Sequence, residues 1–254
     1  MKITVVGAGY VGLSNAVLLA RYHDVTLLEI DPAKVEAINV RRSPIVDEEL
    51  GKSLAHDDLR LNATTDSKVA YDGAELVIVA TPTDYDAAAS YFDTSTVERV
   101  IDEVLLAYPA VPVAIKSTIP VGFVARVRAE HPGATVFFSP EFLREGSALF
   151  DNLHPARIVV GERGEAGRAF ALMMAEAALD EDVPILLTGD TEAEAIKLSA
   201  NTYLALRVAL ANQSLSVAGA GTTAVVGVPE YKPMADEDGT VSCLSGRTGV
   251  GRCS

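Results

Sequence analysis

Cysteine and histidine are scarce in this sequence, and neither is arranged for metal binding or disulfide bonding. The two cysteines, Cys243 and Cys253, fall within the last twelve of the 254 residues. They supply neither a disulfide framework nor a pair of Cys-x-x-Cys knuckles, which favours a reducing compartment. The four histidines are scattered, and no two of them are spaced as His-x-x-x-His. We therefore expect no metal site.

Basic residues are also in short supply. Lys and Arg total 21 against 35 for Asp and Glu, so the formal net charge is −14. This excess of negative charge repels phosphate backbones and anionic lipid, which argues against nucleic acid and against a membrane as partners. It still permits a nucleotide ligand, because backbone amides alone can bind phosphate.

Long apolar runs are missing as well. No run reaches the length of about eighteen residues that a membrane helix needs. The apolar stretch 3–13 resembles a signal peptide only superficially, because its three glycines would weaken an apolar signal helix. We predict a soluble, cytoplasmic protein.

The residues that are present are typical of a globular α/β protein, with 49% hydrophobic and 22% charged residues. Up to about residue 213, short runs of Val, Ile and Leu alternate with amphipathic stretches, which predicts a doubly wound, Rossmann-like parallel sheet. Strands are predicted at residues 3–6, 25–28, 76–80, 113–115, 135–138, 158–160 and 183–187. Helices are predicted at residues 12–22, 32–40, 96–108, 121–130 and 165–178.

Three regions are expected along the chain. Residues 1–189 should form the doubly wound domain, and residues 190–213 a long helix that begins a central helical domain. The tail, residues 214–254, starts as a Gly/Ala/Thr/Val mixture and then has few large apolar residues. An irregular structure is therefore expected there.

Three sequence patterns mark helix starts. Asp31-Pro32 places an N-cap residue before a proline at the first helical position. Ser95-x-x-Glu98 and Thr191-x-x-Glu194 match the capping box, and they predict helices that open near residues 96 and 192.

The glycine-rich segment Gly7-Ala8-Gly9-Tyr10-Val11-Gly12 joins the first predicted strand to the first helix. In such a turn Gly7 allows the tight bend, Gly9 lets the backbone approach a pyrophosphate, and Gly12 lets the helix pack on the strand. Glu29, at the end of the second strand, can accept hydrogen bonds from adenosine ribose hydroxyls and would repel a 2′-phosphate. The segment therefore predicts NAD rather than NADP. Asp31 competes for the role of Glu29 but fits better as a helix cap.

Polar residues also follow two later strands, where open parallel sheets bind ligands. Thr83, in Ala80-Thr81-Pro82-Thr83, is placed to contact a cofactor, although Pro82 fits a plain turn about as well. Thr118, in Lys116-Ser117-Thr118-Ile119-Pro120, could hold a water molecule or a cofactor group. It could also cap a helix before Pro120, and both roles are compatible.

Two further pairs of residues are spaced four apart. If segment 139–146 is helical, Glu141 and Glu145 share a face and could serve as acid and base. For an isolated segment, a solvated charged turn is the favoured alternative. Lys197 and Asn201 share a face of the long helix and could stabilise an oxyanion. A solvated helix face explains that pair too.

Taken together, these segments resemble the UDP-glucose 6-dehydrogenase family from residue 1 to about residue 209. The matching segments are Gly7–Ser14, Ser43–Glu48, Ala80–Thr83, Tyr91–Thr94, Lys116–Gly122, Ser139–Glu145 and Ala200–Arg207. The family oxidises the C6 alcohol of UDP-glucose to a carboxylate, using two NAD molecules in turn. The resemblance thus implies NAD as cofactor and UDP-glucose as substrate.

The resemblance also implies roles for individual residues. NAD would contact Gly7, Gly9, Tyr10, Val11, Gly12, Glu29, Lys34, Thr83, Thr118 and Glu145. The nucleotide sugar would contact Glu141, Phe142, Leu143, Arg144, Lys197 and Asn201. In catalysis Thr118 and Glu145 would position water, while Lys197 and Asn201 would stabilise the oxyanion at C6.

The sequence departs from the family in its last part. The family's nucleophile is a cysteine in a Gly-Gly-x-Cys-x-Pro-Lys-Asp motif, and neither Cys243 nor Cys253 lies in such a motif. From about Leu210 the resemblance stops, as it would in a truncated or frameshifted reading frame. Full-length family members are expected to form homodimers. Alternatives are a dehydrogenase of UDP-N-acetylmannosamine or GDP-mannose, and an NAD-binding remnant without turnover.

Overall fold

The computed structural model describes residues 1–56, 58–86 and 91–217. The chain divides into two compact units, residues 1–207 and 208–254. The first unit holds every strand described below and all the helices except the last turns of α9 (Asp190–Val217). Within the described residues, no helix is long and apolar enough to cross a membrane.

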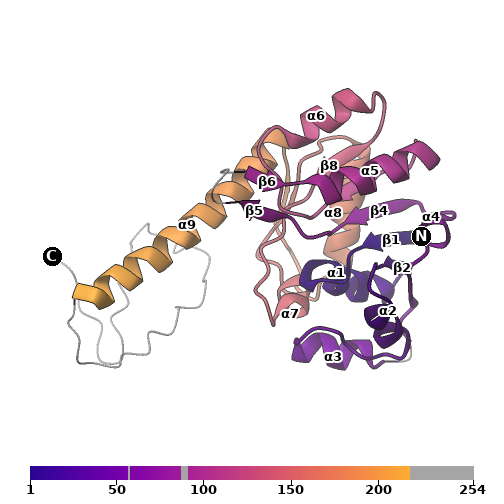
Figure 1. Ribbon diagram of the computed structural model, residues 1–254, viewed down its shortest axis with the longest axis horizontal. Coiled ribbons are helices and arrows are strands. Elements are labelled where there is room, and N and C mark those ends of the chain that lie inside the picture. The colour runs from indigo at the N-terminus through magenta and orange to yellow at the C-terminus, as the bar shows by residue number, and fades with distance from the viewer. Residues whose placement is uncertain (57, 87–90, 218–254) are drawn as a thin grey trace. The chain divides into compact units, whose positions relative to one another are not determined.

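A six-stranded parallel sheet with the order β3-β2-β1-β4-β7-β8 forms the centre of the first unit (Figure 1). Its strands are β1 (Lys2–Val6), β2 (Asp24–Leu28), β3 (Leu61–Thr64), β4 (Leu76–Val79), β7 (Val113–Ile115) and β8 (Val136–Phe138). Because β1 pairs with both β2 and β4, the strand order reverses there. Ligands bind at such a switch point, beyond the carboxyl ends of the strands. The predicted doubly wound sheet is confirmed.

Two smaller strand pairs extend this architecture. The strands β9 (Ile158–Val160) and β10 (Ile185–Leu187) pair in parallel, and the amide of Gly161 donates to the carbonyl oxygen of Phe138 at the end of β8. The strands β5 (Asp84–Asp86) and β6 (Tyr91–Asp93) form an antiparallel hairpin. This hairpin follows β4, directly after Thr83.

Helices cover both faces of the sheet (Figure 1). The described helices are α1 (Tyr10–Ala20), α2 (Pro32–Asn39), α3 (Glu48–Leu54), α4 (Ser67–Tyr71), α5 (Ser95–Ala107), α6 (Phe123–Glu130), α7 (Ala148–Leu153), α8 (Glu165–Ala177) and α9, of which α9 does not cover the sheet. In β4, Leu76 and Ile78 belong to one buried cluster, and Val77 and Val79 to the other. The strand therefore supplies apolar side chains to both faces, as a sheet covered on both sides requires.

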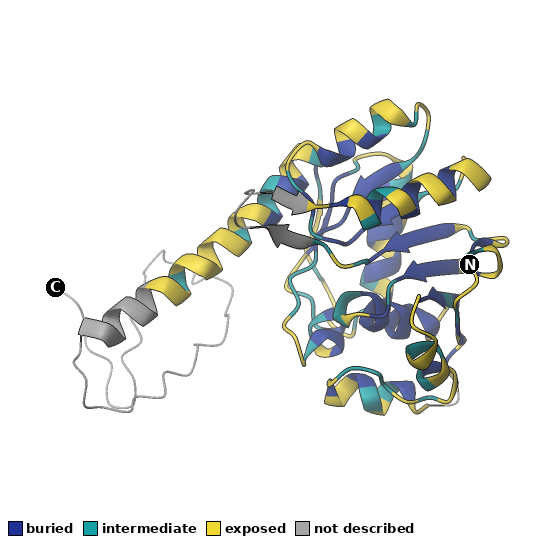
Figure 2. Ribbon diagram, in the orientation of Figure 1, coloured by how far each residue is buried: buried dark blue, intermediate teal, exposed yellow. Residues whose placement is uncertain are grey.

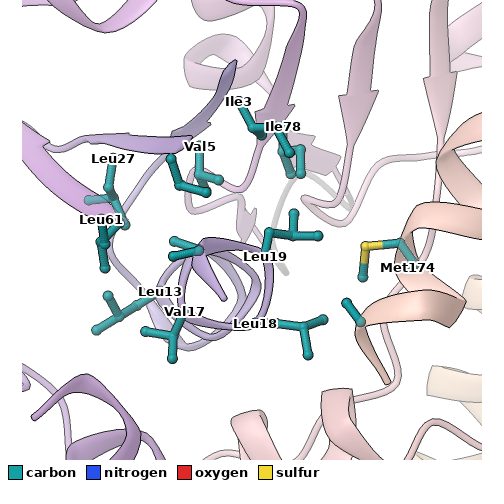
Figure 3. Close-up of a cluster of buried hydrophobic side chains, with 14 of the residues drawn as sticks. Ile3, Val5, Leu13, Val17, Leu18, Leu19, Leu27, Leu61, Ile78 and Met174 are labelled. Carbon is teal, nitrogen blue, oxygen red and sulfur yellow. The ribbon is translucent and has the colours of Figure 1, made fainter. Parts of the chain in front are cut away.

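The helix α1 is buried at nearly every position and lies at the centre of the first cluster. Leu13, Val17, Leu18 and Leu19 of this helix share the cluster with residues of the strands and with Met174 of α8, and Leu19 lies on the side of Met174 (Figure 3). The strands of the sheet are dark blue in Figure 2, while the covering helices expose one face. Burial of α1 fixes the glycine-rich turn at its N-terminus.

The prediction misses six short elements, namely β3, β5, β6, α3, α4 and α7. The three helices have 7, 5 and 6 residues, too few to show a helical period in the sequence. The helix α9 continues to Val217, so the prediction of irregular structure for residues 214–217 is wrong. The rest of the tail, with both cysteines, lies outside the described residues.

All three predicted helix starts lie within two residues of the observed ones, but only the predicted cap of α2 forms, since Asp31 accepts a hydrogen bond from the amide of Ala33. The box at Ser95 is wrong. The helix α5 already begins at that residue, and the carboxylate of Glu98 pairs instead with Arg126, 2.8 Å away on α6. The hydrogen bond from Arg126 lowers the pKa of Glu98. Tertiary pairing thus overrides the local cap.

The box at Thr191 is wrong for a similar reason. The helix α9 starts at Asp190, and Glu194 is fully buried. Its two carboxylate oxygens accept the amides of Gly122 and Val124, at 2.6 and 2.9 Å. Glu194 therefore caps α6 and not its own helix.

Asp47 performs a similar task for two other helices. One of its carboxylate oxygens accepts the amide of Leu50 at 3.0 Å and so caps α3. The other accepts the amide of Ala148 at 2.7 Å, at the N-terminus of α7. Ser147, the N-cap residue of α7, makes no side-chain cap of its own. The buried carboxylate of Asp47 therefore joins two short helices that the sequence pattern does not reveal.

We predict that Asp47→Ala lowers the free energy of unfolding by about 2–4 kcal/mol, because two caps are lost and buried amides are left without acceptors. Asp66→Ala is the matched control, since Asp66 caps only α4 at an exposed site. It should cost about 1 kcal/mol or less. Urea unfolding followed by circular dichroism measures both, and equal losses would contradict the double cap.

Candidate functional site

The glycine-rich turn has the shape that dinucleotide binding requires. Gly7 has a φ of +102°, and a Cβ there would lie 2.6 Å from the carbonyl oxygen of Ala80. A Cβ on Gly12 would lie 1.8 Å from the carbonyl oxygen of Gly7. Around Gly9, by contrast, no atom lies within 4 Å of the corresponding position. Packing therefore demands glycine at positions 7 and 12, while Gly9 leaves open space at the helix N-terminus for a phosphate.

Glu29 lies beside this turn, at the carboxyl end of β2. Its carboxylate accepts the amide of Ala8 at 2.7 Å and that of Asp31 at 3.1 Å, and Lys34 lies 3.9 Å away. Each carboxylate oxygen can accept more than one hydrogen bond, so ribose hydroxyls can still be bound. Glu29 and Lys34, both predicted to contact NAD, are thus brought together with the glycine-rich turn.

Ile30 is a residue that the sequence reasoning missed. It follows Glu29 directly and is 88% exposed. Among the large apolar residues of the described part of the chain, only Leu106 is more exposed. An exposed aliphatic side chain next to the carboxylate of Glu29 offers an apolar surface on which a flat ring could pack. The sequence did contain a signal, because an apolar residue directly follows the acidic residue at the end of the second strand.

The loops after β4 and β7 are tied together. Ser117 Oγ donates to the carbonyl oxygen of Thr81 at 2.7 Å, and Thr96 Oγ1 donates to that of Pro82 at 2.8 Å. Thr83 and Thr118, the two predicted cofactor residues of these loops, are both partly exposed. The proposed cap at Thr118 is not formed, since α6 begins at Phe123 after Gly122. Thr118 stays in the loop at the carboxyl edge of the sheet.

Lys197 and Glu141 form a largely buried ion pair. Lys197 Nζ donates to the carboxylate of Glu141 at 2.8 Å and to its carbonyl oxygen at 2.7 Å. The side chains are 8% and 13% exposed. Phe142 packs nearby, with its ring centroid 5.7 Å from Lys197 Nζ. The structure therefore joins the start of α9 to the loop after β8, and it brings together three residues that the sequence predicts as sugar contacts.

Two predicted neighbours of this pair are placed differently. Segment 141–144 is an irregular loop and residues 145–146 form a turn, so Glu141 and Glu145 do not share a helical face. Glu141 faces Lys197, and Glu145 is exposed. Asn201 lies one turn beyond Lys197 on α9 and is also exposed. The two glutamates therefore do not form the predicted acid–base pair.

Lys116 is a second residue that the sequence reasoning did not single out. Its ammonium is buried, 3.4 Å from Ser139 Oγ and 5.6 Å from the ring centroid of Phe170. Burial lowers the pKa of Lys116 from 10.5 to about 8, while the negative charge of Glu141 opposes this and the positive charge of Lys197 adds to it. Lys116 is thus electrostatically coupled to the Lys197–Glu141 pair.

The helix α9 is held in place by carboxylates in its first two turns. Besides Glu194, Asp190 pairs with Arg128 of α6 at 3.0 Å, and the same guanidinium donates to Glu162 at 2.9 Å. Burial raises the pKa of Glu194, although its backbone hydrogen bonds act in the other direction. Lys197 lies three residues beyond Glu194, so this anchoring directs it to Glu141.

Within the described residues, no group of three or more His, Cys, Asp and Glu side chains is arranged to hold a metal ion. The polar groups that this part of the chain gathers lie instead at the carboxyl edge of the sheet. An open glycine turn, a carboxylate beside it and a buried lysine–carboxylate pair suit a dinucleotide and a polar substrate.

Comparison with known proteins gives these features a context. Residues 1–176 match the NAD binding domain of the UDP-glucose/GDP-mannose dehydrogenase family. A UDP-glucose 6-dehydrogenase of Streptococcus pneumoniae is 46% identical over 219 residues, which cover 84% of this chain and 56% of that protein. The chain thus spans about half the length of the curated relatives it matches.

Solved structures agree with this assignment. A GDP-mannose dehydrogenase from Pseudomonas aeruginosa superimposes with a TM-score of 0.75 and 28% identity, covering 84% of this chain and 52% of that one. A UDP-glucose dehydrogenase from Pyrobaculum islandicum gives 0.73 and 32%, with the same coverage of both chains. The likeness extends over most of the first unit.

We predict that the stability of the chain depends on pH through Lys116. Between about pH 8 and 10.4 the unfolded chain binds this proton and the folded chain does not, so the free energy of unfolding should rise with pH by about 2–3 kcal/mol. Lys116→Met removes this contribution. Urea unfolding at several pH values should show a wild-type minus variant difference that is flat below pH 8 and rises above it. A difference independent of pH would contradict the prediction.

Proposed function

This chain belongs to the UDP-glucose/GDP-mannose dehydrogenase family and carries its NAD binding domain, and we propose that it is the cofactor-binding part of a UDP-glucose 6-dehydrogenase. Such an enzyme oxidises UDP-glucose to UDP-glucuronate with two NAD. The observation that supports this best is the open turn at Gly9 beside the buried carboxylate of Glu29. We propose that residues 1–189 form the NAD-binding domain and residues 190–213 begin the central domain.

The proposed NAD contacts lie along the carboxyl edge of the sheet. The amides of the glycine-rich turn would hold the pyrophosphate, Glu29 the ribose hydroxyls, and Ile30 the face of the adenine ring. The remaining contacts would be Tyr10, Val11, Lys34, Thr83, Thr118 and Glu145. Bound NAD would accept a hydride from C6 of the sugar.

The proposed sugar contacts start from the Lys197–Glu141 pair. An ammonium has three donors, and Glu141 takes two of them, so one remains for the oxygen at C6. Asn201, one turn along α9, would add an amide donor, and Thr118 and Glu145 would position a water molecule. Segment 141–144 would lie along the nucleotide sugar.

The fit to the solved GDP-mannose dehydrogenase supports a related nucleotide sugar as second candidate substrate. The absence of the Gly-Gly-x-Cys-x-Pro-Lys-Asp motif supports another candidate, an NAD-binding protein without turnover. Binding experiments with UDP-glucose and GDP-mannose test the first candidate. A turnover assay tests the second.

We predict that the chain binds NAD more tightly than NADP and that Glu29→Ala lowers NAD affinity by about 10- to 100-fold, because a hydrogen bond to a charged acceptor is lost. NADP affinity should change less, since repulsion of its 2′-phosphate is also relieved. Glu36→Ala, at an exposed position of α2, is the control. Titration calorimetry measures each affinity, and equal or tighter binding of NADP by the wild type would refute the assignment.

We predict that the 254-residue chain produces almost no UDP-glucuronate. Thioester chemistry needs a thiolate held by a preorganised loop, and losing a covalent nucleophile should lower the rate by several orders of magnitude. The assay is NADH formation at 340 nm with UDP-glucose and excess NAD. Sustained release of two NADH per sugar, abolished by Cys243→Ser, would show the expectation to be wrong.

A further inference from the structure

Segment 141–144 is an irregular loop that is clamped at both ends. At one end Glu141 pairs with Lys197 of α9. At the other end Arg144 is bound by Asp151 in the first turn of α7. Arg144 Nη2 donates to Asp151 Oδ1 at 2.7 Å, and Arg144 Nε lies 3.2 Å from both carboxylate oxygens. The backbone amide of Arg144 also donates to Asp151 Oδ2, at 2.7 Å.

This second clamp fixes more than a surface charge pair would. The Asp151 side chain is only 15% exposed, and it binds both the guanidinium and the backbone of Arg144. It therefore sets the path of the main chain as well as the direction of the side chain. Charge-assisted, forked contacts of this kind are among the stronger hydrogen bonds in proteins.

The helix α7, which carries Asp151, is itself held rigidly. Its N-terminus is capped by the buried carboxylate of Asp47, at Ala148. Asn152 Nδ2 donates to Ser14 Oγ on α1 at 2.9 Å, and both side chains are buried. Ala148 and Asn152, on either side of Asp151, are thus both held by hydrogen bonds. The position of Asp151 is therefore well defined, and it can hold a loop that has no regular structure of its own.

We propose that Asp151 is a positioning residue for the nucleotide sugar, because it holds Arg144 and segment 141–144 in the conformation that this ligand needs. The inference rests on the proposed function, which places that segment along the sugar. It assigns no contact between Asp151 and the ligand, since the carboxylate is occupied by Arg144. Apart from Glu145, the proposed NAD contacts lie on loops other than the one that Asp151 holds.

The test compares Asp151→Asn with wild type in titrations with UDP-glucose and, separately, with NAD. Asparagine keeps the shape but loses the charge and one acceptor. We expect affinity for UDP-glucose to fall on the order of tenfold, and affinity for NAD to stay unchanged. Asp180→Asn is the matched control, because Asp180 pairs with His154 at the other end of α7, 2.7 Å away. It should leave both affinities unchanged.

A second measurement follows Arg144 itself. Modification by phenylglyoxal, mapped by mass spectrometry of peptides, should be faster at Arg144 in Asp151→Asn than in wild type. Unchanged affinity for UDP-glucose in Asp151→Asn, or an equal loss of NAD affinity, would overturn the inference. If the wild type binds no UDP-glucose, the proposed function fails. The rate of phenylglyoxal modification at Arg144 then decides by itself whether Asp151 positions Arg144. An unchanged rate then overturns the inference too.

Discussion

The buried carboxylate of Glu194 is the interaction on which the candidate site depends. It caps α6 with two backbone hydrogen bonds and so fixes the start of α9 against the loop that follows β7. Because Lys197 lies almost one turn farther on, the same anchor brings its ammonium to Glu141. The cost of burying Glu194, evident in its raised pKa, is offset by the amides that it satisfies. Together with the Asp190–Arg128 pair, this contact sets the start of α9 relative to the sheet edge.

Carboxylates that accept backbone amides recur throughout the first unit. Asp47 caps α3 and α7, Glu29 holds the amide of Ala8 in the glycine-rich turn, and Asp151 holds the amide of Arg144. Part of the strong negative charge of the chain is therefore structural, and these acids act where loops must be held in one conformation.

Much of the fold could be predicted because its signals are local. Runs of Val, Ile and Leu mark strands buried on both faces, and the glycine-rich segment marks the first turn. Short helices such as α7 could not be found, because 6 residues show no period and the cap comes from Asp47, 101 residues away in the sequence. The capping box at Thr191 failed for the same reason, since the acceptors of Glu194 face a helix 70 to 72 residues distant.

The sequence by itself determined the doubly wound sheet, the glycine-rich turn with Glu29, and the resemblance of residues 1 to about 209 to one dehydrogenase family. Only the tertiary structure decided that Glu141 pairs with Lys197 while Glu145 is exposed, that Lys116 is buried next to Ser139, and that Ile30 is exposed. Periodicity and turn residues encode preferences over a few neighbouring positions. Ion pairs and burial depend instead on which distant segments pack together, and that is settled only when the sheet and its helices assemble.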